Sequence, residues 1–429
     1  MNRREFLEMG LMASAAAGTS LSAFAADEVP LPKIDHRAAK PRNRNPYAGI
    51  DWAKVFQLNG ATHMHAPSEA VLDAAVKHGI EFFTISNYHP AAPTWPGATA
   101  RRPRGLPVSD WPLVVNGRLT KGPFDWNKLV ASWMEHPEQV KGRRTLPYPF
   151  KEGPLLYPHW PKGRLEAPNA EHAQFRFRDG TSTRKLHLCC PGSAFASGTF
   201  DSRNAYKLGT NGYEGSCGQF WGDAIDRMID ALIDPEGGGV TINHPTWTHL
   251  DRAFLLELLD WDPRVLGIEV LSNGYNSEHY WDWALSTGRQ CYGFFTPDWG
   301  WENDADFGVN VLVVPEKTVH ACLKAYRDGD FYGARRGYGE LRFTSIAFDG
   351  AALRATTDKP ARFEVKTARG VVATGEGNEI VWTVPQADRK NSRVGPEVEV
   401  FVRLKAYAAD GCGETLWTQA FMLVDGARG

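Results

Sequence analysis

The sequence predicts an α/β fold, a (β/α) barrel, followed by a smaller all-β domain. Between residues 56 and 296, short apolar runs typical of buried strands alternate with stretches of helical periodicity. Several of these runs end in a polar residue, as barrel strands do at the face that carries an active site. After about residue 341 the pattern changes to period-two alternation without helical runs, which is typical of antiparallel strands.

The composition is that of a folded globular protein without a nucleic-acid partner. The chain has 429 residues, which allows two or three domains of about 150 residues each. Its 48 Lys and Arg residues against 50 Asp and Glu residues give a net charge of −2, so the basic excess typical of nucleic-acid binding is absent. The 15 tryptophans favour aromatic rings that line a ligand cleft, and we expect a small-molecule or glycan substrate.

Residues 1–25 have the organisation of a twin-arginine signal peptide. Paired arginines at positions 3 and 4 precede Phe6 and Leu7, a short apolar stretch follows, and Ala-Phe-Ala ends the segment at residues 23–25. A chance arginine pair on an ordinary secretory signal is the alternative. The segment is too short to cross a bilayer, and no other run of about 20 apolar residues exists, so we expect no membrane span. Either signal implies a periplasmic or secreted protein.

The elements of the barrel follow in order along residues 51–340. Residues 26–50 are polar and rich in proline, which indicates a linker or arm. A strand over 56–62 leads into His63, and Ser68 and Gly79 carry the start and stop signals of the next helix. Further strands are expected at 80–85, 186–190, 240–242, 266–271 and 292–296, and further helices at 223–233, 252–259 and 277–287.

Two segments depart from this alternation. Residues 90–185 are dense in Pro, Trp and Arg, and we expect an insertion that forms either a lid or substrate wall, or a structural cover of the barrel. Residues 341–429 alternate apolar and polar residues and contain the turn dipeptide Asp410-Gly411. They are expected to form a sandwich-like β domain that packs on the barrel.

Candidate metal ligands lie at the ends of predicted strands. His63 and His65 are two apart on one strand, so both imidazoles point to the same face and can reach one ion. His244 ends a later strand just before Pro245, and Asp298 ends another. A buried histidine bonded to backbone is the alternative for His244. Together these residues suffice for a mononuclear hydrolytic site.

This order of motifs resembles the PHP (polymerase and histidinol phosphatase) superfamily. The motifs are His-x-His at 63–65, Thr-Ile-Ser at 84–86, Asn-His-Pro at 243–245, Gly-Ile-Glu-Val at 267–270 and the late Asp298. The C-terminal extension is similar to that of the secreted carbamate-ester hydrolase branch. The resemblance implies a distorted (β/α)7 barrel that holds one to three divalent metals and uses them to activate water for phosphoester or ester hydrolysis.

The resemblance also implies that some of the family's metal-ligand positions are filled by other residues in this sequence. His63, His65, His244 and Asp298 match family ligands, and Glu269 matches a position that is frequently acidic. Ser86-Asn87-Tyr88 stands where the family reads Thr-Asp-His, with His89 one residue late. Ala194 stands where an acidic residue is expected, and Trp299-Gly300 stands where a histidine is expected. One ion is therefore expected, or two if His89 and Glu269 take part. The alternative for Glu269 is a hydrogen bond to a backbone amide or to Asn273.

The expected function is an exported metal-dependent hydrolase acting on an ester, phosphoester or amide. Zinc suits the histidine-rich set best, with manganese or iron open. Asp298 is either a ligand or the base that takes a proton from water. Asn87, Asn243 and Trp299 are expected to contact substrate, and Trp247 is one of several tryptophans near strand ends that can stack on a sugar or an aromatic group.

Two other functional classes stay open from the sequence. One is a non-catalytic binding protein on a degenerate PHP barrel with an incomplete metal site. The other is a glycan-active enzyme that uses carboxylates such as Asp298 and Glu269 without metal.

Overall fold

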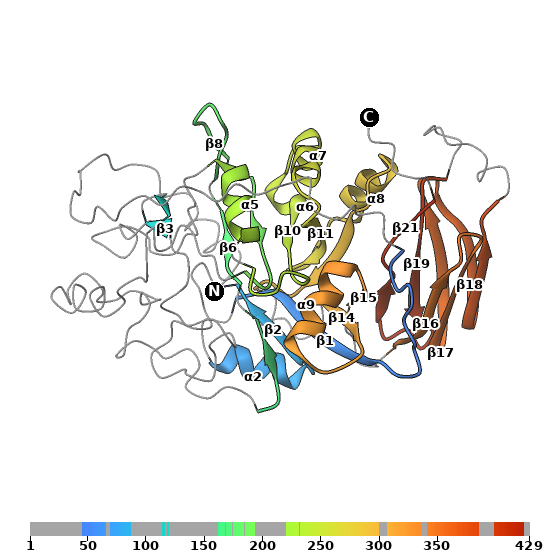
Figure 1. Ribbon diagram of the computed structural model, residues 1–429. Coiled ribbons are helices and arrows are strands. Elements are labelled where there is room, and N and C mark those ends of the chain that lie inside the picture. Colours follow the sequence, from blue (N-terminus) through green and yellow to red (C-terminus); the bar gives the residue numbers. More distant parts are fainter. Residues whose placement is uncertain are drawn as a thin grey trace.

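The computed structural model of the protein contains two large β-sheets with helices packed against them (Figure 1). It describes residues 45–65, 69–86, 114–115, 118–119, 162–167, 169–173, 175–183, 185–193, 220–230, 232–299, 307–335, 341–385 and 399–423. The predicted signal peptide, most of the predicted linker and most of the predicted insertion lie outside these residues. Within them, no helix is long and apolar enough to cross a membrane.

The first sheet has 11 strands and combines the start of the chain with its end. Its order is β16 (Phe343–Phe348), β17 (Ala352–Thr367), β19 (Phe401–Ala408), β20 (Thr415–Trp417), β15 (Phe331–Arg335), β14 (Gly308–Val314), β1 (Phe56–Met64), β2 (Phe82–Ile85) and β5 (Leu165–Glu166), with β18 (Gly370–Thr383) beside β17 and β21 (Phe421–Met422) beside β19.

The second sheet has six strands, which come from the middle of the chain. Its order is β12 (Tyr275–Asn276), β11 (Val265–Ser272), β10 (Val240–Ile242), β9 (Leu188–Cys189) and β6 (Glu171–His172), with β13 (Tyr292–Thr296) beside β11. Two short hairpins stand apart, β3 (Val114–Val115) with β4 (Arg118–Leu119), and β7 (Phe175–Arg176) with β8 (Ser182–Thr183).

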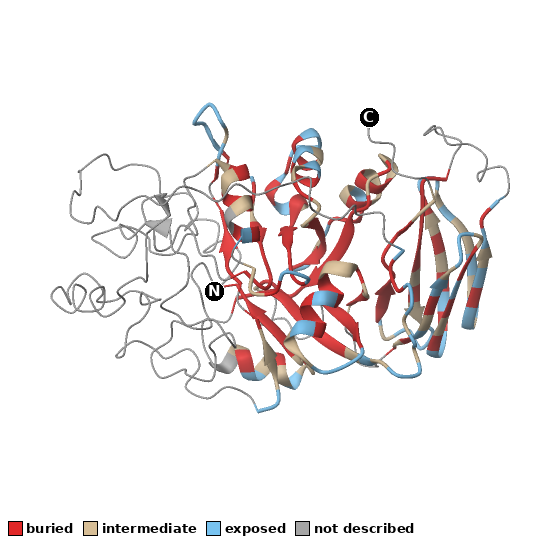
Figure 2. Cartoon of the chain, viewed as in Figure 1, coloured by how far each residue is buried: buried red, intermediate tan, exposed pale blue. Residues whose placement is uncertain are grey.

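Helices connect the parallel strands as predicted. Strands β1 and β2 pair in parallel through α2 (Glu69–Lys77), after which Gly79 takes a positive φ of 77°. Helices α5 (Trp221–Asp230), α7 (Arg252–Trp261) and α8 (Glu278–Ser286) pack against β10, β11 and β13 in one apolar core. Figure 2 shows that buried residues are concentrated along the central strands. The predictions of these helices and strands are confirmed.

The expected (β/α)7 barrel is not formed as one continuous parallel sheet. β9 is antiparallel to β10, β6 is antiparallel to β9, and β14 is antiparallel to β1. The reason for the reversal between β6 and β9 is a hairpin: the chain leaves β6 through β7, turns at Asp179-Gly180, and returns through β8 to β9. A hairpin joins antiparallel strands, whereas parallel neighbours need a longer crossover.

The two sheets nevertheless meet at two places and share an interior. The backbone N–H of His65 donates to Asp298 O (3.1 Å), and that of Asp298 donates to His63 O (3.0 Å). Beyond β2, the N–H of Glu171 donates to Ser86 O (2.9 Å). These bonds place the ends of β1, β2, β6 and β13 around one region.

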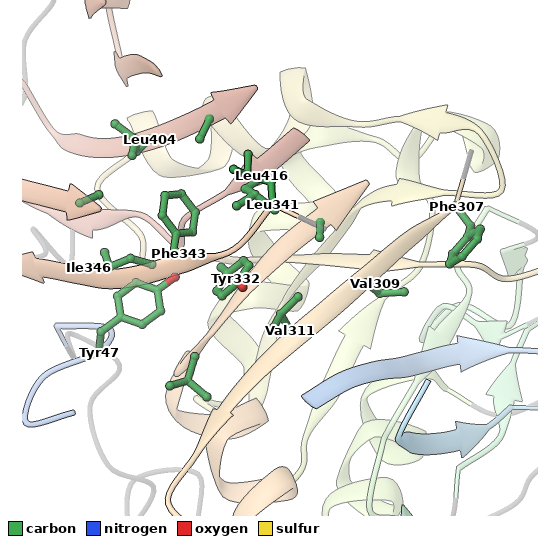
Figure 3. Close-up of a cluster of buried hydrophobic side chains, with 14 of the residues drawn as sticks. Tyr47, Phe307, Val309, Val311, Tyr332, Leu341, Phe343, Ile346, Leu404 and Leu416 are labelled. Atoms are coloured by element: carbon green, nitrogen blue, oxygen red, sulfur yellow. The ribbon is translucent and has the colours of Figure 1, made fainter. Parts of the chain in front are cut away.

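The C-terminal strands extend the first sheet. The described part of residues 341–423 contains only strands, as the alternating pattern predicted, and β15 pairs with β20 so that hydrogen bonding continues from β1 to β17. Figure 3 shows part of one apolar cluster that joins both parts: it contains Val309 and Val311 of β14 together with Phe343, Leu404 and Leu416.

A buried ion cluster fastens α8 to β19. The fully buried guanidinium of Arg403 donates to Glu278 Oε2 (2.7 Å) and lies 2.8 Å from Asp282 Oδ1, while Lys405 Nζ donates to Glu278 Oε1 (2.8 Å). Burial alone would raise the pKa of Glu278, but Arg403 and Lys405 outweigh it and hold this pKa far below its ordinary value.

We expect Glu278→Gln to destabilise the protein by about 3 kcal/mol at pH 7, because Arg403 would lose a buried charge partner. Since the pKa of Glu278 is depressed in the folded state, its contribution is complete above the unfolded value of about 4.3 and is lost as the pH falls below it. Denaturant unfolding at pH 7 and pH 3.5 measures this.

Glu364→Gln, which removes the partner of the half-exposed Arg362, is the control and should cost under about 1 kcal/mol. Equal losses in both variants would contradict the prediction.

Candidate metal centre

Seven ionisable side chains from distant parts of the chain converge where the two sheets meet. They are four histidines and three carboxylates: His63, His65, His187, His244, Glu171, Glu269 and Asp298. Each belongs to a strand or lies within two residues of one. His187 and Asp298 are the most open, with side chains 14% and 10% exposed, and the others are almost fully buried.

The strand geometry explains why the first histidines and Asp298 are close. His63 and His65 point to one side of β1, and their Nε2 atoms are 3.3 Å apart. The backbone bridge between Met64 and Asp298 brings the aspartate beside them, with Oδ1 3.4 Å from the Nε2 atom of each histidine. His244 and Asp298 take positive φ values of 27° and 50°, which are uncommon for residues with a Cβ and recur at functional sites.

Glu171 lies at the middle of the cluster and faces histidines with both oxygens. Its Oε2 is 3.0 Å from His65 Nε2. Its Oε1 is 2.9 Å from His187 Nδ1 and 3.2 Å from His244 Nε2. Oε1 also lies 3.7 Å from His63 Nε2, so Glu171 approaches all four histidines of the cluster.

Three sets of potential ligand atoms are compact enough to hold a cation. They are His63 with His244 and Asp298, His63 with His65 and Glu171, and Glu171 with His187 and His244; within each set the atoms lie within 4.8 Å of one another. Imidazole nitrogens and carboxylate oxygens are the donors that zinc, manganese and iron accept. The Nδ1 atom of His244 is buried and, in the described part of the chain, has no hydrogen-bond partner. The donor set therefore fits a divalent metal.

Glu269 contacts two of the histidines in the cluster, His63 through its side chain and His244 through its backbone. Its Oε1 lies 2.6 Å from His63 Nδ1, and its Oε2 accepts the backbone N–H of His244 at 2.9 Å. Both oxygens are engaged, and Glu269 belongs to none of the three compact sets. This matches the alternative of a bond to a backbone amide, and a carboxylate in this place fixes the tautomer and orientation of a ligating imidazole.

The buried charges shift the pKa values of the cluster. Burial by itself lowers the pKa of His63, but Cys189, Glu269, Asp298 and Glu171 outweigh it and raise this pKa well above its ordinary value. The pKa of Glu171 lies well below its ordinary value, because His63 and His187 outweigh the effect of burial. The carboxylates around His63 therefore favour a proton on its ring in the metal-free chain.

The structure places the remaining predicted site residues as follows. Asn243, which was expected to contact substrate, is fully buried and donates to Oε1 of the candidate ligand Glu171 (3.2 Å). The Trp299 ring stacks on His65 with centroids 4.3 Å apart. His89 and Asn87 lie outside the described residues.

Glu171 and His187 were missed by the sequence analysis. Both lie in or next to the stretch assigned to an insertion, and their two-residue strands are too short to show periodicity. The Asp179-Gly180 turn was the available signal, because Asp-Gly favours a hairpin. Pairing outward from that turn sets Glu171 opposite Cys189, two residues from His187.

Comparisons with known proteins find similarity only among solved structures. Neither a family model nor a curated protein matches the chain. A crystal structure from Bacteroides vulgatus ATCC 8482, described as a two-domain protein containing a predicted PHP-like metal-dependent phosphoesterase, is similar to it at 13% sequence identity and a TM-score of 0.35. The similarity covers 81% of this chain and 90% of that one.

We expect Glu171→Gln to weaken metal binding at least tenfold, because an amide is a poorer ligand and leaves three histidines without their shared carboxylate. Calorimetric titration of the metal-free protein with Zn²⁺ measures the affinity. The control is Glu236→Gln, which alters a carboxylate outside the cluster and should leave the titration unchanged. Unaltered binding in Glu171→Gln would rule Glu171 out as a ligand.

Metal uptake should release protons at pH 7. The pKa values of His63 and His244 are raised, so in the metal-free chain these rings stay protonated to higher pH than a free imidazole of pKa about 6.5. A ring must be neutral to bind metal, so the apparent affinity should rise with pH through this range. Titrations in two buffers of different ionisation enthalpy count the protons. Binding without proton release would show that the rings are already neutral.

Proposed function

We propose that the protein is a metal-dependent hydrolase of the PHP type, acting on an ester, phosphoester or amide. The observation that carries this proposal is Glu171, whose two oxygens lie among histidines on both sides inside a buried cluster. The PHP assignment is supported by the motif residues His63, His65, His244, Glu269 and Asp298, all of which lie in this one cluster.

Two of the compact donor sets would each hold one ion: His63, His65 and Glu171 form one, and Glu171, His187 and His244 form the other. Asp298, whose Oδ1 lies 3.4 Å from His63 and from His65, would add a donor to the first set. Zinc suits the histidine-rich set, and manganese or iron can take the same donors. Two ions of charge +2 against three carboxylates leave an excess of about one positive charge, which favours negative charge that develops on a substrate.

The protein side chains would orient the reaction. Divalent ions, when bound, would supply Lewis acidity and lower the pKa of a water ligand to about 7. Asp298 is the most exposed carboxylate of the cluster and lies 3.4 Å from both His63 and His65, so it is placed to bind metal or to take the proton of an entering water. Glu269 holds the Nδ1 edge of His63, which directs Nε2 into the cluster.

The geometry argues against a metal-free glycosidase. Such an enzyme needs two carboxyl groups that face the substrate. Glu269 is buried, and both its oxygens are used by His63 and the His244 amide.

Export is part of the proposal. It is supported by the twin-arginine pattern of residues 1–25. The candidate ligands come from positions 63 to 298, so the site exists only in a folded chain, which suits a route for proteins that are already folded. A periplasmic or secreted location follows.

We expect Asp298→Asn to lower hydrolysis at least a hundredfold, because an amide cannot take a proton and is a weak ligand. Turnover of 4-nitrophenyl acetate and bis(4-nitrophenyl) phosphate by the zinc-loaded protein measures this. Asp260→Asn, at an exposed pair with Arg289, is the control and should keep full activity.

A chelator should abolish turnover and added zinc should restore it. Full activity in Asp298→Asn would refute the role of this residue, and a wild type that takes up no metal would favour a non-catalytic protein.

A further inference from the structure

Trp247 is a large ring that stays exposed beside the metal centre. Its exposure is 42%, which is unusual because tryptophan is normally mostly buried. It lies on the short helix α6 (Pro245–Thr248), which starts directly after His244, and its backbone N–H donates to His244 O (2.9 Å). The ring is therefore carried by the same turn that positions a candidate ligand.

The ring borders the cluster at its more open side. Its centroid is 5.0 Å from that of His244 and 5.4 Å from that of His187, with interplanar angles of 84° and 78°. His187 is the most exposed member of the cluster, at 14%. A molecule that approaches the centre past His187 therefore meets the indole of Trp247.

The fold does not use this ring as a core residue. The three apolar clusters of the described chain do not include Trp247. Helix α6 is held instead by backbone bonds from Leu250 N–H to Pro245 O (3.0 Å) and by a 2.7 Å hydrogen bond between the hydroxyls of Thr246 and Ser277. The exposed indole surface is thus available to a ligand without any change in the helix.

We propose that Trp247 forms a stacking subsite for a flat ring in the substrate, next to the group that is hydrolysed. The inference rests on the proposed function and adds a substrate class to it: esters, phosphoesters or amides that carry a planar ring close to the scissile bond. Indole stacks on flat partners through offset or edge-to-face contacts, which a compact or puckered group cannot make as well. Trp247 is a specificity-determining residue in this scheme and takes no part in the chemistry.

Three phosphonates test the subsite without turnover, because their C–P bond is not hydrolysed. Phenyl-, cyclohexyl- and methylphosphonate present the same oxygens to the metal and differ only in the group beside it. We expect the zinc-loaded wild type to bind phenylphosphonate about tenfold more tightly than either of the others. Trp247→Leu should abolish this preference and leave methylphosphonate binding unchanged.

Two further variants make the comparison specific. Trp247→Phe keeps an aromatic face and should retain part of the preference. Trp283→Leu removes a tryptophan of α8 whose ring lies by Arg252, and it should behave as the wild type. Zinc stoichiometry and thermal unfolding of each variant show that the site and the fold are intact.

Several outcomes would overturn the inference. Equal binding of phenyl- and cyclohexylphosphonate would show a site for apolar bulk and not for flat rings. A preference that survives in Trp247→Leu would place the subsite elsewhere, and a wild type without any preference has no such subsite.

A wild type that prefers phenylphosphonate but hydrolyses nothing would refute the proposed function alone. A wild type that hydrolyses substrates without preference would refute the subsite alone, and one that takes up no metal would refute both.

Discussion

The backbone bridge between Met64 and Asp298 is the contact on which the centre depends. Its two hydrogen bonds involve His63 O and the His65 N–H, so pairing of the main chain sets two imidazoles and one carboxylate side by side. Met64 itself is fully buried, and its N–H donates to the hydroxyl oxygen of Ser86 (3.0 Å), which ties the same residue to the end of β2. The site is thus built by strand pairing, and its side chains follow from it.

Burial of three carboxylates makes the cluster costly unless each is compensated. Glu269 is balanced by His63 and a backbone amide, and Glu171 by three histidines and Asn243. The raised pKa values of His63 and His244 favour protons on these two rings, and divalent cations would supply positive charge in their place. The charge balance and the donor geometry therefore point to the same chemistry, although they come from different physical effects.

The long apolar sheet gives the centre a rigid frame. Strand β1 carries His63 and is also paired with β14, which continues through β15 and β20 to the C-terminal strands. The Arg403 cluster then fastens those strands to α8, a helix that packs beside β11 and so beside Glu269. Through this path, the C-terminal part of the chain is connected to the sheet that positions the candidate metal ligands.

Local patterns in the sequence were enough for the helices, most central strands and the placement of His63, His65, His244 and Asp298 at or near strand ends. Each depends on periodicity or on a single break in it, and these are properties of neighbouring residues. Only the tertiary structure showed that Glu171 and His187 belong to the cluster and that Glu269 contacts His63. The antiparallel pairing of β9 and β14 with their neighbours was also seen only there. Their positions depend on register between segments far apart in the chain. That register is decided by packing and hydrogen bonding across the whole sheet, and no local window of residues contains it.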